Sequence, residues 1–136
     1  MNLTVEEARF FYRARFLTNY DGDTVDVELD MGFRHIWSMR LRLYGINAPE
    51  LRTTTLEAGK LSRDFIRSLL INRHFYVRTY KDEADKYGGR WLAEIFAPIS
   101  FVTPSDFKTA YFDEKGTLTN INQLMIDAGF AVAYTP

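Results

Sequence analysis

The chain has 136 residues, of which 46% are hydrophobic and 15% aromatic, enough apolar material for one compact domain and too little length for two ordinary ones. Charged residues make up 26% and the formal net charge is −1, which excludes disordered, collagen-like and coiled-coil chains and argues against nucleic-acid binding through bulk positive charge. The absence of cysteine excludes disulfide frameworks, thiolate zinc sites and cysteine nucleophiles.

Alternation of apolar and polar residues predicts three strands in the first third of the chain. Residues 11–18 are short and aromatic-rich, and they run into a turn signal at residues 19–22. Apolar and acidic side chains alternate over residues 25–31, which is typical of a strand with one buried face. The alternation resumes over residues 36–44 and places Arg42 on the polar face. We expect an antiparallel meander.

A helical period replaces the alternation after residue 50. Apolar residues three and four apart over residues 61–70 predict a helix, and Thr54 with Glu57 offers a capping box at its start. Two further strands are predicted over residues 75–80 and 91–96, joined by a polar loop with two glycines.

The last third of the chain predicts an insertion and a short helix. Residues 97–119 contain two prolines and a glycine without sustained periodicity, so we expect a long inserted loop. A helix begins near Ile121 and ends at Gly129. Five strands with a helix after the third fit an α+β, mainly β fold, a five-stranded Greek-key OB-type barrel with two or three packed helices.

One polar turn has the composition of a cation site. Asp21, Gly22, Asp23 and Thr24 place two carboxylates and a hydroxyl within four residues, which are plausible oxygen ligands for a hard cation such as Ca²⁺. An Asp-Gly turn more often serves backbone geometry alone. An EF-hand is excluded, because Asp26 stands at the sixth loop position where glycine is required.

Arg42 and Glu50 bracket a second polar turn. A guanidinium can bind two phosphate oxygens and a carboxylate can take a proton from water, so the pair suits phosphodiester hydrolysis. Arg90 follows two glycines in a turn that would fix its direction. Taken singly, each of the three is more often a solvated surface charge. His35 and His74 lack ligand-spaced partners, which argues against zinc and Ser-His chemistry.

Four motifs follow one another over nearly the whole chain. They are DGDT at residues 21–24, RLYGINAPE at 42–50, DKYGGRWLA at 85–93, and IN at 121–122 leading to GFA at 129–131. In this order they resemble the staphylococcal nuclease (thermonuclease) family. The resemblance implies an OB-fold barrel and Ca²⁺-dependent hydrolysis of phosphodiester bonds in DNA and RNA, with single-stranded or frayed substrate favoured by stacking and backbone contacts.

The resemblance also implies a metal site. By position, Asp23 is similar to a direct Ca²⁺ ligand, and Asn47 falls where the family has its second aspartate ligand. Ala48 stands where a backbone carbonyl binds the metal, and Asp21 is similar to an acidic neighbour that holds metal-bound water. Calcium and other hard divalent cations both remain open.

The remaining implied roles concern the substrate. Arg42 and Arg90 resemble two arginines that grip the phosphate and stabilise the charge of the trigonal-bipyramidal transition state. Glu50 resembles the carboxylate that positions or deprotonates the attacking water. Tyr87 resembles a tyrosine that contacts the substrate phosphate, and Tyr134 resembles a nucleotide-stacking tyrosine.

Three features depart from the family pattern. Asn47 removes one negative charge from the implied metal site, so weaker metal binding is expected. Gly89 adds a residue before Arg90. Residues 97–119, and the end of the sequence at Pro136, also differ from family members that continue into another C-terminal helix.

The leading hypothesis is a metal-dependent endonuclease that acts on DNA, RNA or both, because Arg42, Glu50 and Arg90 are all present in order. The alternative is a nuclease-like module that binds nucleic acid or protein without cleaving. A third possibility is a structural subunit that uses residues 97–119 to bind a protein partner.

We expect one domain over residues 1–136, with its core at about residues 11–134. The N-terminal residues lack a basic segment followed by an apolar one, so no signal peptide is expected. No apolar run approaches the ~20 residues of a membrane span. An intracellular protein without a membrane partner is therefore expected.

Overall fold

The computed structural model describes residues 2, 4, 10–80, 90–101, 110–113 and 115–135. Its elements are, in chain order, β1 (Phe11–Asp21), β2 (Thr24–Asp30), β3 (Ile36–Leu43), β4 (Ile46–Asn47), α1 (Leu56–Leu70), β5 (His74–Thr79), β6 (Trp91–Ala97), β7 (Ile99–Phe101), β8 (Ala110–Phe112), β9 (Thr119–Asn120), α2 (Ile121–Asp127) and β10 (Val132–Ala133). Among these described residues, no helix is both long and apolar enough to cross a membrane.

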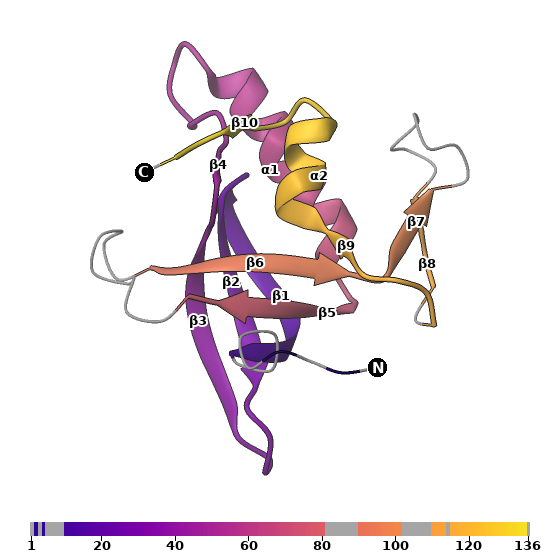
Figure 1. Cartoon of the computed structure of the whole chain (residues 1–136). Coiled ribbons are helices and arrows are strands. Elements are labelled where there is room, and N and C mark those ends of the chain that lie inside the picture. The colour runs from indigo at the N-terminus through magenta and orange to yellow at the C-terminus, as the bar shows by residue number, and fades with distance from the viewer. Residues whose placement is uncertain are drawn as a thin grey trace.

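Five of the strands close into a barrel. β1, β2 and β3 form the expected antiparallel meander, β1 also pairs with β5, and β5 pairs with β6. A short parallel pairing between β3 and β6 completes the ring (Figure 1). The OB-type barrel that the motifs imply is therefore confirmed.

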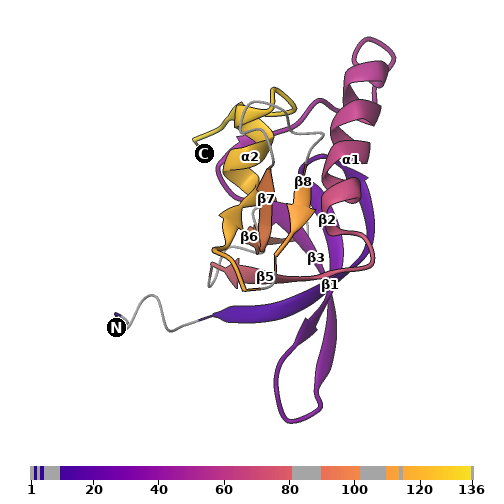
Figure 2. The ribbon, with the colours of Figure 1, turned by 90° about the vertical axis from the view of Figure 1, so that its right-hand side faces the viewer.

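Alternation along the strands explains why the barrel has a filled interior. Val25, Val27 and Leu29 of β2 are at most 2% exposed, whereas the residues between them point outward. Phe75 and Val77 of β5 are fully buried in the same way. The two helices pack at the end of the barrel away from the β2–β3 turn (Figures 1 and 2).

The predicted helix exists but begins differently. Thr55, not Thr54, is the N-cap residue of α1, and its hydroxyl donates to the Glu50 carbonyl at 2.6 Å instead of capping the helix. The capping box of Thr54 and Glu57 is therefore wrong, because the N-cap falls one residue later, at Thr55, whose hydroxyl binds the loop before the helix. The helix ends near Asn72, which has a φ of 60°.

The expectation of a long loop over residues 97–119 is also wrong. β7 and β8 pair antiparallel (Figure 2), and β9 pairs with β6 just before α2 (Figure 1). Strands of two or three residues are too short for alternation to reveal. The middle of this segment, residues 102–109 and 114, lies outside the described residues.

The C-terminal part of the fold meets the expectation of a short helix. The Asn120 side chain caps α2 by accepting from the Gln123 backbone, and Gly129, with a φ of 82°, ends the helical turn. β10 then pairs with β4, and Tyr134 donates its backbone N–H to the Gly45 carbonyl. This pairing brings the end of the chain beside the turn after β3.

Candidate active site

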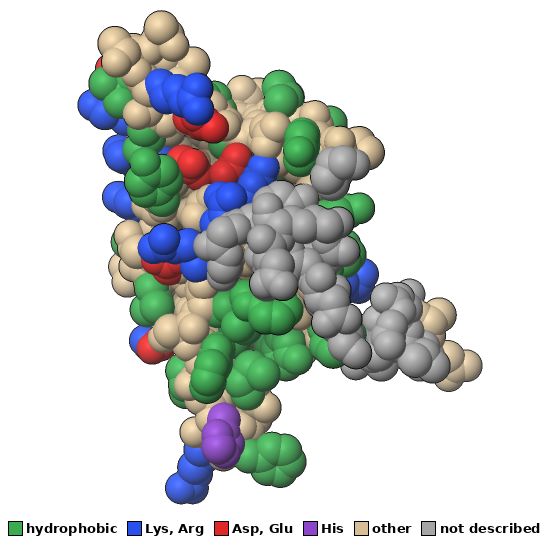
Figure 3. Space-filling view, turned by 90° about the vertical axis from the view of Figure 1, so that its left-hand side faces the viewer, with side chains coloured by type: hydrophobic (Ala, Val, Ile, Leu, Met, Phe, Trp, Pro, Cys, Tyr) green, Lys and Arg blue, Asp and Glu red, His purple; other side chains and the backbone are tan. Residues whose placement is uncertain are grey.

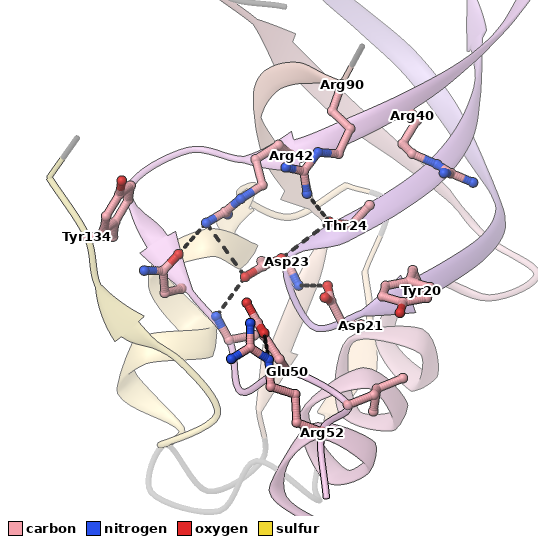
Figure 4. Close-up of a pocket in the computed structure, with 13 residues that line it drawn as sticks. Tyr20, Asp21, Asp23, Thr24, Arg40, Arg42, Glu50, Arg52, Arg90 and Tyr134 are labelled. Atoms are coloured by element: carbon pink, nitrogen blue, oxygen red, sulfur yellow. Dashed lines mark hydrogen bonds and ion pairs between the residues drawn. The ribbon is translucent and has the colours of Figure 1, made fainter. Parts of the chain in front are cut away.

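A pocket of about 940 Å³ opens on the side of the barrel where β1 ends and β2 begins, beside the end of β3 and β4 (Figure 4). It is lined by Tyr20, Asp21, Asp23, Thr24, Arg40, Arg42, Asn47, Ala48, Glu50, Leu51, Arg52, Arg90 and Tyr134. Acidic and basic side chains gather on the upper half of this face of the molecule, whereas hydrophobic side chains dominate its lower half (Figure 3).

The turn between β1 and β2 presents the two aspartates. The backbone N–H of Asp23 donates to Asp21 Oδ1 at 3.0 Å, so the first carboxylate fixes the turn. A Cβ atom on Gly22 would lie 1.9 Å from Ser62 Oγ of α1 and 2.8 Å from the Ala48 Cβ. Only glycine therefore lets the turn approach the helix and β4 this closely.

Asp23 is the centre of the polar contacts. Its Oδ2 accepts a hydrogen bond from the Ala48 backbone N–H at 2.8 Å and lies 3.6 Å from Arg42 Nη2. Its Oδ1 accepts from the Thr24 hydroxyl at 3.3 Å. Asp23 and Arg42 are 7% and 6% exposed, so they face each other largely shielded from water.

The pKa of the Asp21 carboxyl is shifted by its surroundings in the pocket. Burial of its carboxyl, followed by the hydrogen bond and the charge of nearby Asp23, raises the pKa of Asp21 from 3.8 to about 6. The negative charge on this pair of carboxylates is thus incompletely balanced by the protein itself.

Two arginines approach this acidic centre. Arg42 donates from Nη1 to the Leu43 carbonyl at 2.8 Å and from Nη2 to Asn47 Oδ1. Arg90 donates from Nη1 to the Thr24 hydroxyl at 3.1 Å. Arg42 and Arg90 converge because the parallel β3–β6 pairing sets Arg42 opposite the second residue of β6, and Arg90 immediately precedes that strand.

Glu50 is the accessible acid of the pocket. Its side chain is 59% exposed and forms an ion pair with Arg52. In the view of Figure 4, Asp23 lies between Arg42 and Glu50. α1 packs closely under this loop, because a Cβ on Gly59 would lie 2.8 Å from the Glu50 carbonyl oxygen. The helix thus fixes the backbone from which Glu50 projects.

The structure brings together all but one of the residues that the sequence proposed for the site. Asp21, Asp23, Arg42, Asn47, Ala48, Glu50, Arg90 and Tyr134 all line the pocket. Tyr87, and the additional residue Gly89, lie outside the described residues.

Four lining residues were not predicted. Tyr20 precedes the aspartate turn, Arg40 shares the outer face of β3 with Arg42, and Leu51 and Arg52 follow Glu50 directly. Arg40 pairs with Asp26 at 2.8 Å and remains exposed at the pocket rim. The alternation along β3 could have pointed to Arg40, which lies on the same polar face as Arg42. The other three are identified only from the folded structure.

The oxygen atoms in the pocket suit a hard divalent cation. Carboxylates of Asp21 and Asp23, the amide oxygen of Asn47 and backbone carbonyls are the ligand types that such cations prefer. The raised pKa of Asp21 also fits, since a cation would relieve the repulsion between the two carboxylates. Within the described residues, no three His, Cys, Asp or Glu side chains form a metal-ligand group, so Asn47 would have to complete the site.

Comparison with known proteins adds two findings. The model of a family described as Staphylococcal nuclease homologue matches residues 40–136, a range that includes Arg42, Asn47, Glu50 and Arg90. A micrococcal nuclease of Shigella flexneri is 30% identical over 123 residues, which are 90% of this chain and 59% of that protein. The chain thus spans about three-fifths of the length of this relative.

Proposed function

The chain belongs to the family of staphylococcal nuclease homologues, and from this premise we propose that it hydrolyses phosphodiester bonds in DNA, RNA or both. The observation that supports the proposal best is the convergence of Arg42, Arg90 and Glu50 on one pocket with two buried aspartates. Guanidinium groups that can bind a phosphate, and a carboxylate that can accept a proton from water, then lie around the same space.

The two arginines would hold the scissile phosphate. Arg90 projects a guanidinium toward Thr24, and Arg42 directs its Nη2 toward Asp23 and Asn47. Both carry a guanidinium cation, so they would offset the charge that develops on the phosphate oxygens in the transition state. Arg42 is buried, and its shielding from water strengthens this effect.

Glu50 would orient the attacking water or accept its proton. Its exposed carboxylate has access to solvent, while its ion pair with Arg52 holds the side chain at the pocket wall. A carboxylate can act in this way when it lies within hydrogen-bond reach of the water.

Asp23, Asn47 and the Ala48 carbonyl would hold a divalent cation, with Asp21 beside them, and we propose Ca²⁺ as the first candidate. When bound, the cation would supply positive charge to a non-bridging phosphate oxygen. Asn47 donates no negative charge, so the expected affinity is lower than that of a site with an aspartate in its place.

The test is cleavage of single-stranded DNA and RNA by the purified chain across a Ca²⁺ titration. We expect cleavage that EDTA abolishes, and at least a ~100-fold lower kcat in Glu50→Gln and Arg42→Ala, because each removes a group acting on the transition state. Duplex DNA in parallel reactions tests the proposed preference for single strands.

Glu57→Gln is the matched control, since Glu57 is an exposed glutamate in the first turn of α1 and does not line the pocket. It should cleave like the wild type. Folded Glu50→Gln protein with wild-type activity would contradict the proposed role of Glu50, and a folded wild type without cleavage at millimolar Ca²⁺ would contradict the nuclease.

One observation favours a second candidate, a module that binds nucleic acid without cleaving it. Asn47 replaces an expected carboxylate, and its amide oxygen accepts a hydrogen bond from Arg42. Arg42 also donates to the Leu43 carbonyl, so part of its donor capacity is used within the protein. Substrate binding without cleavage at any cation concentration would support this candidate.

A further inference from the structure

Outside the pocket, the outer face of the β1–β5 ladder sets arginines beside ring side chains. The cross-strand register pairs Arg15 with His74 and Arg13 with Tyr76. Phe75, which lies between the two outward positions of β5, is fully buried in the barrel. The sheet therefore presents cations and rings together on its outer surface.

This surface is hollowed. Three hollows of about 80, 240 and 360 Å³ all have His74 in their lining. Arg13 lines two of them, and Arg15 lines two. We call this surface the β1–β5 track and define it by Arg13, Arg15, Phe16, Arg73, His74 and Tyr76.

Two arginines of the track, Arg15 and Arg73, are held in place before any ligand binds. Arg15 donates to Glu28 at 3.0 Å, and the guanidinium of Arg73 lies 3.7 Å from the centre of the Phe112 ring. The described lining of the 360 Å³ hollow contains both arginines and no carboxylate, whereas Glu28 and Asp30 also line the 80 Å³ hollow. Arginines restrained in this way lose less entropy when they bind an anion.

The track and the active-site pocket are built from different residues, among those that the structure describes. β1 connects them, since Arg15 lies in the middle of this strand and Asp21 at its end (Figure 2). Six residues of strand span at most about 20 Å, and two register irregularities of β1 between Arg15 and Asp21 shorten this distance. A single nucleic-acid strand would therefore need to be several nucleotides long to contact the track and the active-site pocket at the same time.

We propose that the β1–β5 track binds a stretch of single-stranded nucleic acid outside the active-site pocket, an inference that rests on the proposed nuclease function. Arg13 and Arg15 lie two residues, or about 7 Å, apart along β1, a separation suited to neighbouring phosphates of an extended strand. The rings contribute less, because Phe16 packs against the core and Tyr76 is half-buried and stacks on Phe11, so the exposed arginines would provide most of the binding. The negative charge of the strand complements the arginines.

The test is binding of a fluorescent single strand of about 20 nucleotides, longer than the ~4–16 nucleotides that one OB barrel covers. Anisotropy is measured in EDTA over a range of salt concentrations, with a gel to verify that the strand stays intact. Arg13→Ala/Arg73→Ala should weaken binding about tenfold at low salt and lower the salt slope by about 1.4, since each phosphate contact to a single strand contributes about 0.7.

Two variants control this experiment. Lys60→Ala removes an exposed cation from α1 and should bind like the wild type. Arg13→Lys/Arg73→Lys keeps both charges and should restore most of the affinity and the salt slope. The proposal would be overturned if Arg13→Ala/Arg73→Ala bound the strand with wild-type affinity, or if Lys60→Ala lost as much affinity as this double variant.

The outcomes separate the track from the nuclease. A wild type that binds the strand through Arg13 and Arg73 but cleaves nothing with any cation would overturn the proposed function and leave the track standing. A wild type that cleaves, with binding unaffected in Arg13→Ala/Arg73→Ala, would overturn the track alone.

Discussion

At the scale of single residues, the charge balance around Asp21 and Asp23 sets the properties of the pocket. Asp23 has Arg42 at 3.6 Å and two hydrogen-bond donors, whereas Asp21 is buried next to Asp23 and its pKa is raised to about 6 by burial and by that neighbour. Ionisation of Asp21 therefore destabilises the cation-free protein, and the same negative charge would attract a divalent cation.

Asp21→Asn should consequently stabilise the cation-free protein at neutral pH. A carboxyl whose pKa is raised in the folded state contributes stability below pH 3.8 that is lost as the pH rises through about 6. The variant should gain at most about 3 kcal/mol at pH 7.5, the free energy that separates a pKa of 3.8 from one of about 6. Thermal unfolding in EDTA at several pH values measures this gain.

The gain must shrink toward pH 4, where Asp21 is protonated in the folded state, and Asp26→Asn is the control. Asp26 is a partly exposed carboxylate that pairs with Arg40 on the outside of β2, so its replacement should not stabilise the protein at pH 7.5. A gain for Asp21→Asn that is independent of pH would refute the electrostatic explanation.

Individual residues also mark the limits of sequence-based prediction. Arg42 was placed correctly on the polar face of β3, but alternation implies exposure there, and the side chain is buried against Asp23 and Asn47. Its partners lie on β2 and β4, and alternation along one strand contains no information about neighbours on other strands. The order of motifs nevertheless identified Arg42, Glu50 and Arg90 as residues of one pocket.

At the scale of elements, α2 packs on the barrel through Ile121, Leu124 and Met125 and is also linked to it by one buried amide. Asn122 accepts from the Ile95 backbone N–H at 3.1 Å and donates to the carbonyls of Tyr44 and Ala93 at 2.9 and 3.0 Å. Three backbone groups of two segments thus depend on a side chain that is 4% exposed. The sequence included Asn122 in a family motif, but only the folded structure assigns it this structural task.

Asn122→Ala should lower the free energy of unfolding by about 2–4 kcal/mol, because it removes three hydrogen bonds to backbone groups, although the Ala93 carbonyl keeps the Tyr44 N–H as a partner. Urea unfolding followed by circular dichroism measures the loss. Gln123→Ala changes the next residue of α2, which is exposed, and should cost less than about 1 kcal/mol. Equal stabilities of the two variants would show that the buried hydrogen bonds of Asn122 contribute little.

Elements that depend on local pattern were predicted well, and those that depend on tertiary contacts were not. The five barrel strands and both helices follow from periodicity, whereas β7, β8 and the start of α1 at Thr55 do not. The hydroxyl of Thr55 binds the Glu50 carbonyl, a contact that the capping-box pattern does not represent. Barrel closure through the parallel β3–β6 pairing was implied by the family motifs, not by periodicity.

At the scale of the whole molecule, three distant segments meet behind the aspartate turn. Ser62 of α1 is fully buried, donates to the Phe130 carbonyl at 2.8 Å, and lies where a Cβ on Gly22 would stand. The β1–β2 turn, the helix and the segment after α2 are therefore packed at one point. The positions of Asp21 and Asp23 depend on this junction.

Gly22→Ala should disturb both stability and the site. Its methyl group would lie 1.9 Å from Ser62 Oγ and 2.8 Å from the Ala48 Cβ, so the turn must move away from α1 and β4. We expect a loss of about 1–3 kcal/mol, the usual cost of overpacking, together with weaker cation binding and slower cleavage. Thermal unfolding and the Ca²⁺ dependence of cleavage measure the two effects.

A double-mutant cycle with Ser62→Ala then tests whether the junction is the cause. Removing the hydroxyl opens space for the methyl group, so Gly22→Ala/Ser62→Ala should lose less stability than the sum of the single losses. Ser68→Ala, at an exposed position of the same helix, is the matched partner for the control cycle and should be additive with Gly22→Ala. Additivity in both cycles would mean that Gly22 acts through the conformation of its own turn or its contact with Ala48, and not through the Ser62 hydroxyl.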